Sequence, residues 1–98
     1  MPSKTFANTT PPSKNDIRIA VVAMIASFAK RDPDKVKDSD ELVKDLRIPD
    51  SSLPFLTLSL RGYIKHFRPD RSIGIGEVRK PKQTVGVVVT TVQDRILS

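Results

Sequence analysis

The sequence predicts an all-α fold with three main helices that share one core. Two segments carry apolar residues at the three- and four-residue spacings of one helix face, and the last segment before the C-terminus shows a similar stripe. Only one segment has a strand-like composition, and a lone strand has no partner with which to pair. Since a chain of 98 residues buries a single core, we expect one helical domain over residues 14–98.

The first helix is predicted over residues 14–30. Its buried face consists of Ile17, Val21, Met24, Ile25 and Phe28. Ser13 and Asp16 have the spacing of a capping box, in which each side chain accepts a backbone N–H of the other residue at a helix start. Pro33 disfavours a helical conformation in the residue before it, so we expect the helix to end just before this proline.

Residues 1–13 are expected to form a flexible N-terminal arm. They combine Pro, Ser, Thr and Lys with few residues that a core could bury. They also lack the apolar stretch of a secretory leader, so we expect a cytoplasmic protein. No segment approaches the ~20 apolar residues of a transmembrane helix, which predicts that the chain has no membrane span.

The second helix is predicted over residues 52–67, with Leu53, Leu56, Leu60, Ile64 and Phe67 at helical spacing. Pro54 is compatible with it because proline is tolerated in the first turn. The loop before it is expected to close onto the core through Val36, Leu42, Val43 and Leu46. Asp50, Ser51 and Ser52 directly precede the helix, and we expect one of their side chains to accept the free amides of its first turn.

The third helix is predicted over residues 84–97, with Thr84 as its N-cap. Its β-branched run from Val87 to Val92 also suits a strand, and the helix is preferred because no second strand is present. The connector 68–83 is expected to contain a short helical turn and to be held to the core by Ile73, Ile75 and Val78. The predicted core contains Ile17, Val21, Met24, Phe28, Leu46, Leu56, Leu60, Ile64, Val88, Val92 and Ile96.

The composition excludes several kinds of chemistry. The chain has no cysteine, which removes disulfides, thiol catalysis and cysteine-ligated zinc. His66 is the single histidine, so a site with several histidines is excluded, and no carboxylate or nucleophile lies beside it in the sequence. We therefore expect His66 to be a surface residue and the protein to be a carrier or binding module, not an enzyme.

The formal charge of +6 is concentrated in the second half of the chain. Residues 61–82 of this half hold seven basic residues, which are Arg61, Lys65, Arg68, Arg71, Arg79, Lys80 and Lys82. Clustered cations attract polyanions, so one hypothesis is a small nucleic-acid-binding domain in which these residues contact phosphates. Another is an acidic protein partner, bound through Arg61, Lys65 and Arg68.

The order of the predicted elements resembles the acyl carrier protein family. That family also has a long helix, a long loop anchored by one valine, a helix that begins near Asp-Ser, a connector and a last helix opened by Thr-Val. In the loop, Val36, Leu42 and Leu46 repeat the family's spacing, and the Asp45-Leu46 pair looks like its Asp-Leu element. Thr84-Val85 is similar to the start of its last helix. The resemblance covers residues 15–97 and implies a four-helix bundle with a short helix in the connector.

In that family, a serine in an Asp-Ser-Leu motif carries phosphopantetheine, whose thiol holds an acyl group as a thioester. The corresponding stretch here is Asp50-Ser51-Ser52-Leu53, which has the elements of the motif in a different spacing. Ser52 precedes a leucine as the family's serine does, and Ser51 follows an aspartate as that serine does. Counting from Leu46 without a gap puts Asp50 at the serine position, and aspartate cannot carry the group.

Three functional interpretations follow from these patterns. The resemblance implies a carrier that tethers an acyl or related intermediate through phosphopantetheine on Ser52 as the first choice or on Ser51 as the second. Its partners would be a phosphopantetheinyl transferase and the acyl-transfer or synthase enzymes of fatty acid or polyketide biosynthesis. The alternatives are a degenerate, unmodified member of the family that acts as a protein-interaction module, and the nucleic-acid-binding domain.

Overall fold

The computed structural model describes residues 10–98, which form four α-helices. These are α2 (Lys14–Ala29), α3 (Leu53–Phe67), α4 (Ile75–Val78) and α5 (Val85–Leu97), with the 3₁₀ turns η1 (Pro33–Lys35) and η2 (Asp50–Ser52) between α2 and α3. The all-α prediction is confirmed, and each main helix begins and ends within one residue of its predicted bounds. The predicted N-terminal arm lies outside the described residues up to position 9, and residues 10–13 have no regular secondary structure.

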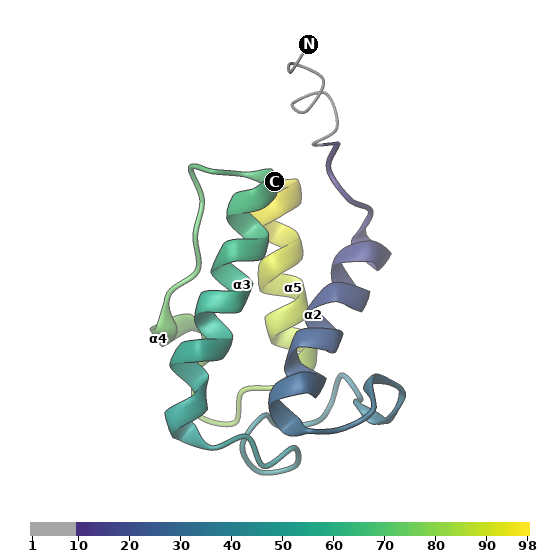
Figure 1. The fold of residues 1–98 in the computed structure, drawn as a ribbon, viewed down its shortest axis with the longest axis vertical. Helices are drawn as coiled ribbons and strands as arrows, with labels where there is room; N and C mark the ends of the chain where they lie inside the picture. The colour runs from purple at the N-terminus through teal and green to yellow at the C-terminus, as the bar shows by residue number, and fades with distance from the viewer. Residues whose placement is uncertain (1–9) are drawn as a thin grey trace.

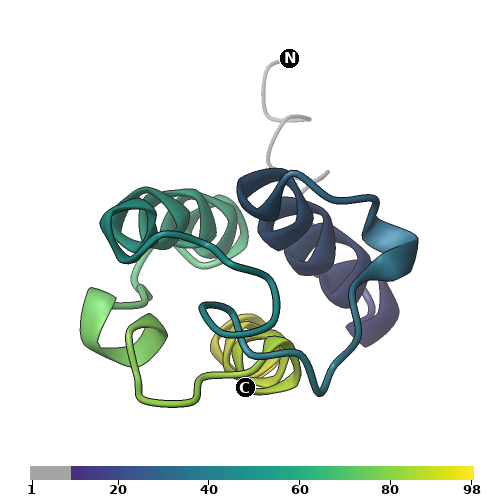
Figure 2. The ribbon, with the colours of Figure 1, turned by 90° about the horizontal axis from the view of Figure 1, so that it is seen from below.

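The three long helices stand side by side (Figure 1). α3 and α5 run in the same direction and α2 runs opposite to both, while α4 flanks α3 on the outside. The long connection between α2 and α3 covers one end of the bundle, where it meets the segment that leads into α5 (Figure 2). We call this end the loop end of the molecule. No helix among the described residues has the length and apolar character that a bilayer crossing requires.

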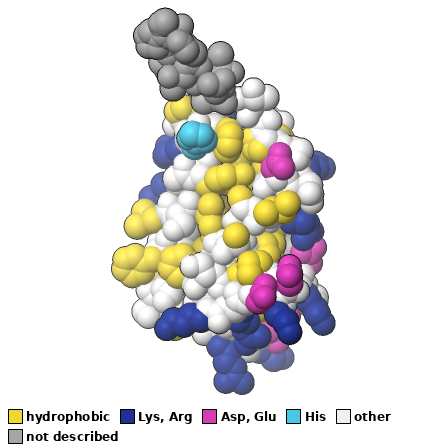
Figure 3. All heavy atoms as spheres, turned by 45° about the vertical axis from the view of Figure 1, so that its right-hand side comes forward, with side chains coloured by type: hydrophobic (Ala, Val, Ile, Leu, Met, Phe, Trp, Pro, Cys, Tyr) yellow, Lys and Arg dark blue, Asp and Glu magenta, His cyan; other side chains and the backbone are white. Residues whose placement is uncertain are grey.

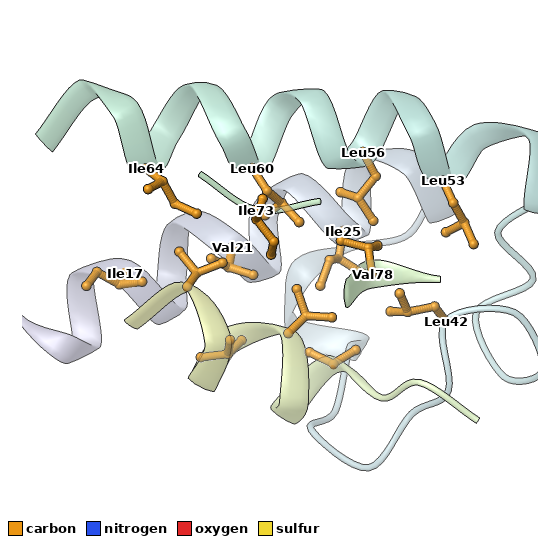
Figure 4. Close-up of a cluster of buried hydrophobic side chains, with 14 of the residues drawn as sticks. Ile17, Val21, Ile25, Leu42, Leu53, Leu56, Leu60, Ile64, Ile73 and Val78 are labelled. Carbon is orange, nitrogen blue, oxygen red and sulfur yellow. The ribbon is translucent and has the colours of Figure 1, made fainter. Parts of the chain in front are cut away.

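One core joins all the helices. Side chains of α3 point toward those of α2 and α5, with Ile73 and Val78 packed beside them (Figure 4). Nine of the predicted core residues are fully buried, whereas Met24 and Phe28 are partly buried against the cluster. The other buried hydrophobic residues are Ile25, Ala26, Leu42, Ile48, Leu53, Ile73, Val78, Val85 and Val89.

The N-caps that the sequence predicts for the first and third helices are both present. At α2, the Ser13 hydroxyl accepts the Asp16 N–H at 3.0 Å and the Asp16 carboxylate accepts the Ser13 N–H at 3.2 Å, which is the predicted capping box. At α5, the Thr84 hydroxyl accepts the Val87 N–H at 3.4 Å. The valine-rich segment is therefore helical, because its Val85, Val88, Val89, Val92 and Ile96 stripe is buried against the bundle.

Backbone hydrogen bonds join the long loop to the segment before α5. The Leu42 N–H donates to the Gln83 carbonyl at 2.9 Å, and the Val85 N–H donates to the Asp40 carbonyl at 3.0 Å. Glu41 and Thr84 form an isolated antiparallel bridge between these bonds. This pairing brings residues 41–44 beside residues 80–83 at the loop end, and the candidate site is built there.

Candidate functional site

The Asp-Ser-Ser turn that resembles a carrier motif lies at the loop end. Asp50, Ser51 and Ser52 form η2, which leads directly into α3. The Ser52 N–H donates to the Pro49 carbonyl at 2.8 Å, and the Leu53 N–H donates to the Asp50 carbonyl. Leu53 is buried in the core, so the turn is fixed to the bundle through the residue that follows it.

The prediction that this turn caps α3 is wrong, because no side-chain capping bond is present at the start of the helix. Ser52 has φ −89° and ψ −15°, which is helical backbone and not the extended conformation of a capping residue. Its amide and that of Leu53 are already bonded within the 3₁₀ turn, which removes the need for a side-chain acceptor. The serine side chains are therefore not used to start the helix.

The two serines differ in exposure. Ser51 is exposed to solvent, whereas Ser52 is half-buried. An enzyme that modifies a hydroxyl has to reach it, so the geometry favours Ser51 as an accessible position. The sequence pattern alone favours Ser52, because of the leucine that follows it.

The Asp50 carboxylate forms an ion pair with Arg79, the residue that directly follows α4. Its Oδ1 lies 3.2 Å from Arg79 Nε, and Arg79 Nη2 donates to the Asp50 carbonyl at 3.4 Å. Both side chains are largely exposed, so the pair contributes little to stability. It nevertheless places the residues that follow α4 next to the Asp-Ser-Ser turn.

An open hollow of about 470 Å³ lies beside this turn. It lies between the loop before α3, the start of α3 and the segment after α4, and its lining is Glu41, Val43, Lys44, Asp50, Leu53, Arg79, Lys80, Pro81 and Lys82. Four of these residues are cationic and two are acidic, and the Asp50 charge is already opposed by Arg79. Lys and Arg side chains gather at the same end of the molecule in Figure 3. The hollow therefore has an excess of positive charge, which attracts an anion.

Most of the remaining basic residues of the second half donate hydrogen bonds to backbone carbonyls of this chain. Arg61 Nε donates to the Ile73 carbonyl at 3.1 Å, and Arg68 Nε donates to the Ile96 carbonyl at 2.8 Å. Both bonds are partly buried and tie α3 to the connector or to the end of α5.

Lys65 and Arg71 also bind backbone carbonyls of this chain. Lys65 Nζ donates to the Pro69 carbonyl at 3.2 Å, and Arg71 Nη1 donates to the Arg95 carbonyl at 3.0 Å and also to the Ser98 carbonyl. Of the basic residues assigned to phosphate contacts in the nucleic-acid hypothesis, only Lys80 and Lys82 make no hydrogen bond or ion pair within the described chain. These two lysines line the hollow.

His66 is exposed on α3, as predicted. Its ring meets the ring of Phe67 edge-on, with the centroids 4.8 Å apart. Within residues 10–98, no cluster of His, Asp and Glu side chains has the arrangement of a metal site.

Sequence reasoning missed the hollow itself. Lys44 and Pro81 belong to segments that are far apart in the chain, and the pairing of Leu42 with Gln83 that brings them together leaves no local pattern in the sequence. No protein-family model matches this chain, and neither a curated protein nor a solved structure matches it.

Proposed function

We propose that this chain is a carrier domain similar to the acyl carrier proteins, which tethers an acyl or related intermediate through phosphopantetheine on Ser51. One observation carries the proposal: an exposed serine, free of any capping role, lies in the turn before α3 beside a cationic hollow. The order of the helices in the bundle is compatible with the resemblance in sequence.

The residues around Ser51 fit this group. A phosphodiester on the hydroxyl would carry a negative charge, and the hollow that Asp50, the residue before Ser51, helps to line holds Lys44, Arg79 and Lys80 as compensating charge. The dipole of the fifteen-residue helix α3, which begins two residues after Ser51, favours the same sign of ligand. When bound, phosphopantetheine supplies a thiol for a thioester, while the protein supplies the attachment point and presents it to synthase or acyl-transfer enzymes.

A second candidate is an unmodified member of the same family that acts as an interaction module. It is favoured by Asp50, which takes the serine position when the sequence is counted from Leu46 without a gap. The Asp50 carboxylate is paired with Arg79, and this interaction gives the residue a structural role of its own.

The two candidates are separated by modification in vitro. The purified protein is incubated with coenzyme A and several phosphopantetheinyl transferases of broad specificity, and its intact mass is measured. The carrier proposal expects the addition of one phosphopantetheine, lost in Ser51→Ala and kept in Ser52→Ala, with circular dichroism confirming that both variants are folded. The reverse pattern would assign the group to Ser52. No addition with any of the transferases would exclude the carrier and leave the interaction module.

A further inference from the structure

The exposed side of α2 is apolar where the surface of a helix is normally charged. No residue from Ile19 to Ala29 has an ionisable side chain, and Ser27 is the one polar residue of this stretch. A helix that lacks a charged face is usually covered by other structure. Here Ile19 is 59% exposed, and Ala23 and Ser27 are exposed as well. The fold therefore leaves an apolar face of α2 uncovered in the part of the chain that the structure describes.

The exposed residues of this helix lie on one side of it. They follow one another at spacings of three or four residues, which places them on one face, and they are Asp16, Ile19, Ala23, Ser27 and the C-cap residue Lys30. We call these five residues the outer face of α2. Figure 3 looks onto the side of the molecule on which α2 lies, and hydrophobic side chains form an almost continuous area there.

Opposite charges stand at the two ends of the outer face of α2. Asp16 lies seven residues before Ala23, and Lys30 lies seven residues after it. Neither side chain takes part in an ion pair within residues 10–98. The Asp16 carboxylate accepts the Ser13 N–H through Oδ2, and its Oδ1 makes no hydrogen bond within the same residues. Both charges are thus available to another molecule.

An antiparallel pairing of two α2 helices about Ala23 makes these charges complementary. In a two-fold contact the same face meets itself, so a residue before the axis lies opposite the residue equally far behind it. Asp16 of one copy then lies opposite Lys30 of the second copy, and this pair forms twice. Ile19 lies opposite Ser27, whose small side chain leaves room for it, while Ala23 lies on the axis.

We propose that the outer face of α2 is the contact through which two copies of this chain form an antiparallel, two-fold dimer. Charge complementarity selects this arrangement, because a parallel pairing would put Asp16 opposite Asp16 and Lys30 opposite Lys30. The antiparallel arrangement also places the two loop ends, where the lysines of the hollow lie, at opposite ends of the dimer (Figure 1). It thereby separates the cations of two chains that each carry a net charge of +6.

The contact is small, so the dimer is expected to be weak. α2 has 16 residues and is ~24 Å long, and a strip ~10 Å wide along it covers ~240 Å² against the ~800 Å² per partner of a stable complex. Tyr63 of α3 is half-buried at the border of this strip, where burial and the neighbouring Asp16 carboxylate raise the pKa of its hydroxyl. We expect a dissociation constant of roughly 0.1 to 1 mM.

A lipid surface suits the outer face of α2 less well. Anionic headgroups would repel the exposed Asp16 carboxylate. Arg18, the cation next to Ile19, already binds both carboxylate oxygens of Asp38, at 2.6 and 2.5 Å. The inference goes beyond the proposed function, since it requires no modified serine. Its test uses the unmodified protein, so its failure and the failure of the carrier proposal are separate results.

Sedimentation equilibrium of the unmodified protein between ~0.01 and ~1 mM tests the dimer. A reversible equilibrium between monomer and dimer is expected, and NMR spectra of the ¹⁵N-labelled protein over the same range should show amide shifts centred on Ile19, Ala23 and Ser27. A monomer at every concentration, or shifts centred on α3 or α5, would overturn the proposal.

Charge reversal tests the antiparallel register. Asp16→Lys and Lys30→Asp each put like charges opposite one another twice, so each variant should dimerise at least about ten-fold more weakly. In an equimolar mixture of the two variants, both positions again hold opposite charges, and the affinity should return to within about three-fold of wild type. Circular dichroism checks that Asp16→Lys is folded, because the substitution removes half of the capping box. A mixture that associates no better than the single variants would contradict this register.

A charge on the two-fold axis tests the centre of the contact. Ala23→Glu brings two carboxylates together there and should weaken the dimer at least about ten-fold. Thr90→Glu is the matched control, because it adds the same charge at an exposed position of α5, and it should change the affinity less than about two-fold. Equal effects of the two substitutions would show that net charge governs association and would overturn the proposal.

The same two variants test a lipid surface as the occupant. Vesicles of phosphatidylcholine and phosphatidylserine are expected to bind wild type and Ala23→Glu within about two-fold of each other, because the cations of the loop end are unchanged in the variant. Vesicle binding that is lost in Ala23→Glu and kept in Thr90→Glu would assign the outer face of α2 to a lipid surface and would contradict the dimer.

Discussion

Arg95 on α5 binds the carboxylate of Glu77 on α4 through both terminal nitrogens of its guanidinium group. Arg95 Nη1 donates to Glu77 Oε1 at 3.0 Å, and Arg95 Nη2 pairs with Glu77 Oε2. Glu77 Oε1 also accepts the Gly74 N–H at 3.1 Å, which closes the first turn of α4. The hydrogen bonds from Arg95 hold the pKa of the Glu77 carboxyl below its ordinary value, against the opposing effect of burial. This ion pair adds to the buried Val78 side chain in holding the four-residue helix against the bundle.

Replacing Glu77 by glutamine is expected to lower the free energy of unfolding at neutral pH by about 1 kcal/mol at most, because the pair is roughly one-third exposed. The folded-state pKa of Glu77 lies below the unfolded-state value, so the stabilisation is complete above the ordinary glutamate pKa of about 4.3. It is lost as the pH falls through the folded-state pKa. The difference in the free energy of unfolding between wild type and Glu77→Gln should therefore shrink toward zero in acid.

Urea unfolding at a series of pH values measures this difference. Asp70→Asn is the matched control, because Asp70 is exposed in the connector. A gap between wild type and Glu77→Gln that stays constant into strong acid would show that the carboxylate charge is not the stabilising feature.

Leu60→Ala should destabilise the protein by roughly 2–5 kcal/mol. Leu60 has no exposed surface, so truncation loses its transfer free energy and leaves a cavity. Leu58→Ala, two residues earlier on the same helix, removes the same atoms from a side chain that is 56% exposed and should cost less than about 0.5 kcal/mol. Chemical denaturation measures the free energy of unfolding of both variants. Equal losses of this free energy would mean that the buried face of α3 is misassigned.

The serines provide a test of helix capping. Ser13→Ala removes the hydroxyl of a capping box and should cost about 1 kcal/mol. Ser51→Ala and Ser52→Ala remove hydroxyls that cap nothing, so each should change stability by less than about 0.5 kcal/mol. Thermal unfolding of the three variants is the measurement, and a loss at Ser52 as large as that at Ser13 would restore the capping interpretation.

Arg68→Ala should cost about 1 kcal/mol, because the Ile96 carbonyl at the end of α5 loses its partly buried donor. Lys80→Ala, at the open hollow, should change the free energy of unfolding by less than about 0.5 kcal/mol.

Binding of the same variants to a labelled oligonucleotide over a range of salt concentrations addresses the nucleic-acid hypothesis. A steep salt dependence that becomes shallower in Arg68→Ala would mean that this residue contacts phosphate instead of holding the fold.

Helix positions could be predicted from the sequence because they depend on local spacing. The stripes around Val21, Leu60 and Val92 each repeat within one segment, and the capping box at Ser13 spans a single turn. The short α4 was expected as a turn in the connector, where Ile73 and Val78 meet the core.

The candidate site could be predicted only in part, because its geometry depends on contacts distant in the chain. The 3₁₀ conformation of Ser52, which makes a capping bond unnecessary, is not encoded in the preference of serine for helix starts. The sequence shows that basic residues are clustered between positions 61 and 82. The fold alone divides them into residues that donate to backbone carbonyls, such as Arg68, and lysines that line the hollow, such as Lys80.

The packing of α2 against α5, the most extensive contact between any two helices in the described chain, has a consequence for synthesis in the cell. α2 emerges from the ribosome long before α5, and its apolar stripe from Ile17 to Ile25 packs partly against α3 but lacks its most extensive partner until α5 is made. Pairs so distant in sequence also slow the closure of the core. We therefore expect a ribosome-bound nascent chain that stops before Val85 to remain open to protease, and protection to arise only once residue 97 has left the exit tunnel.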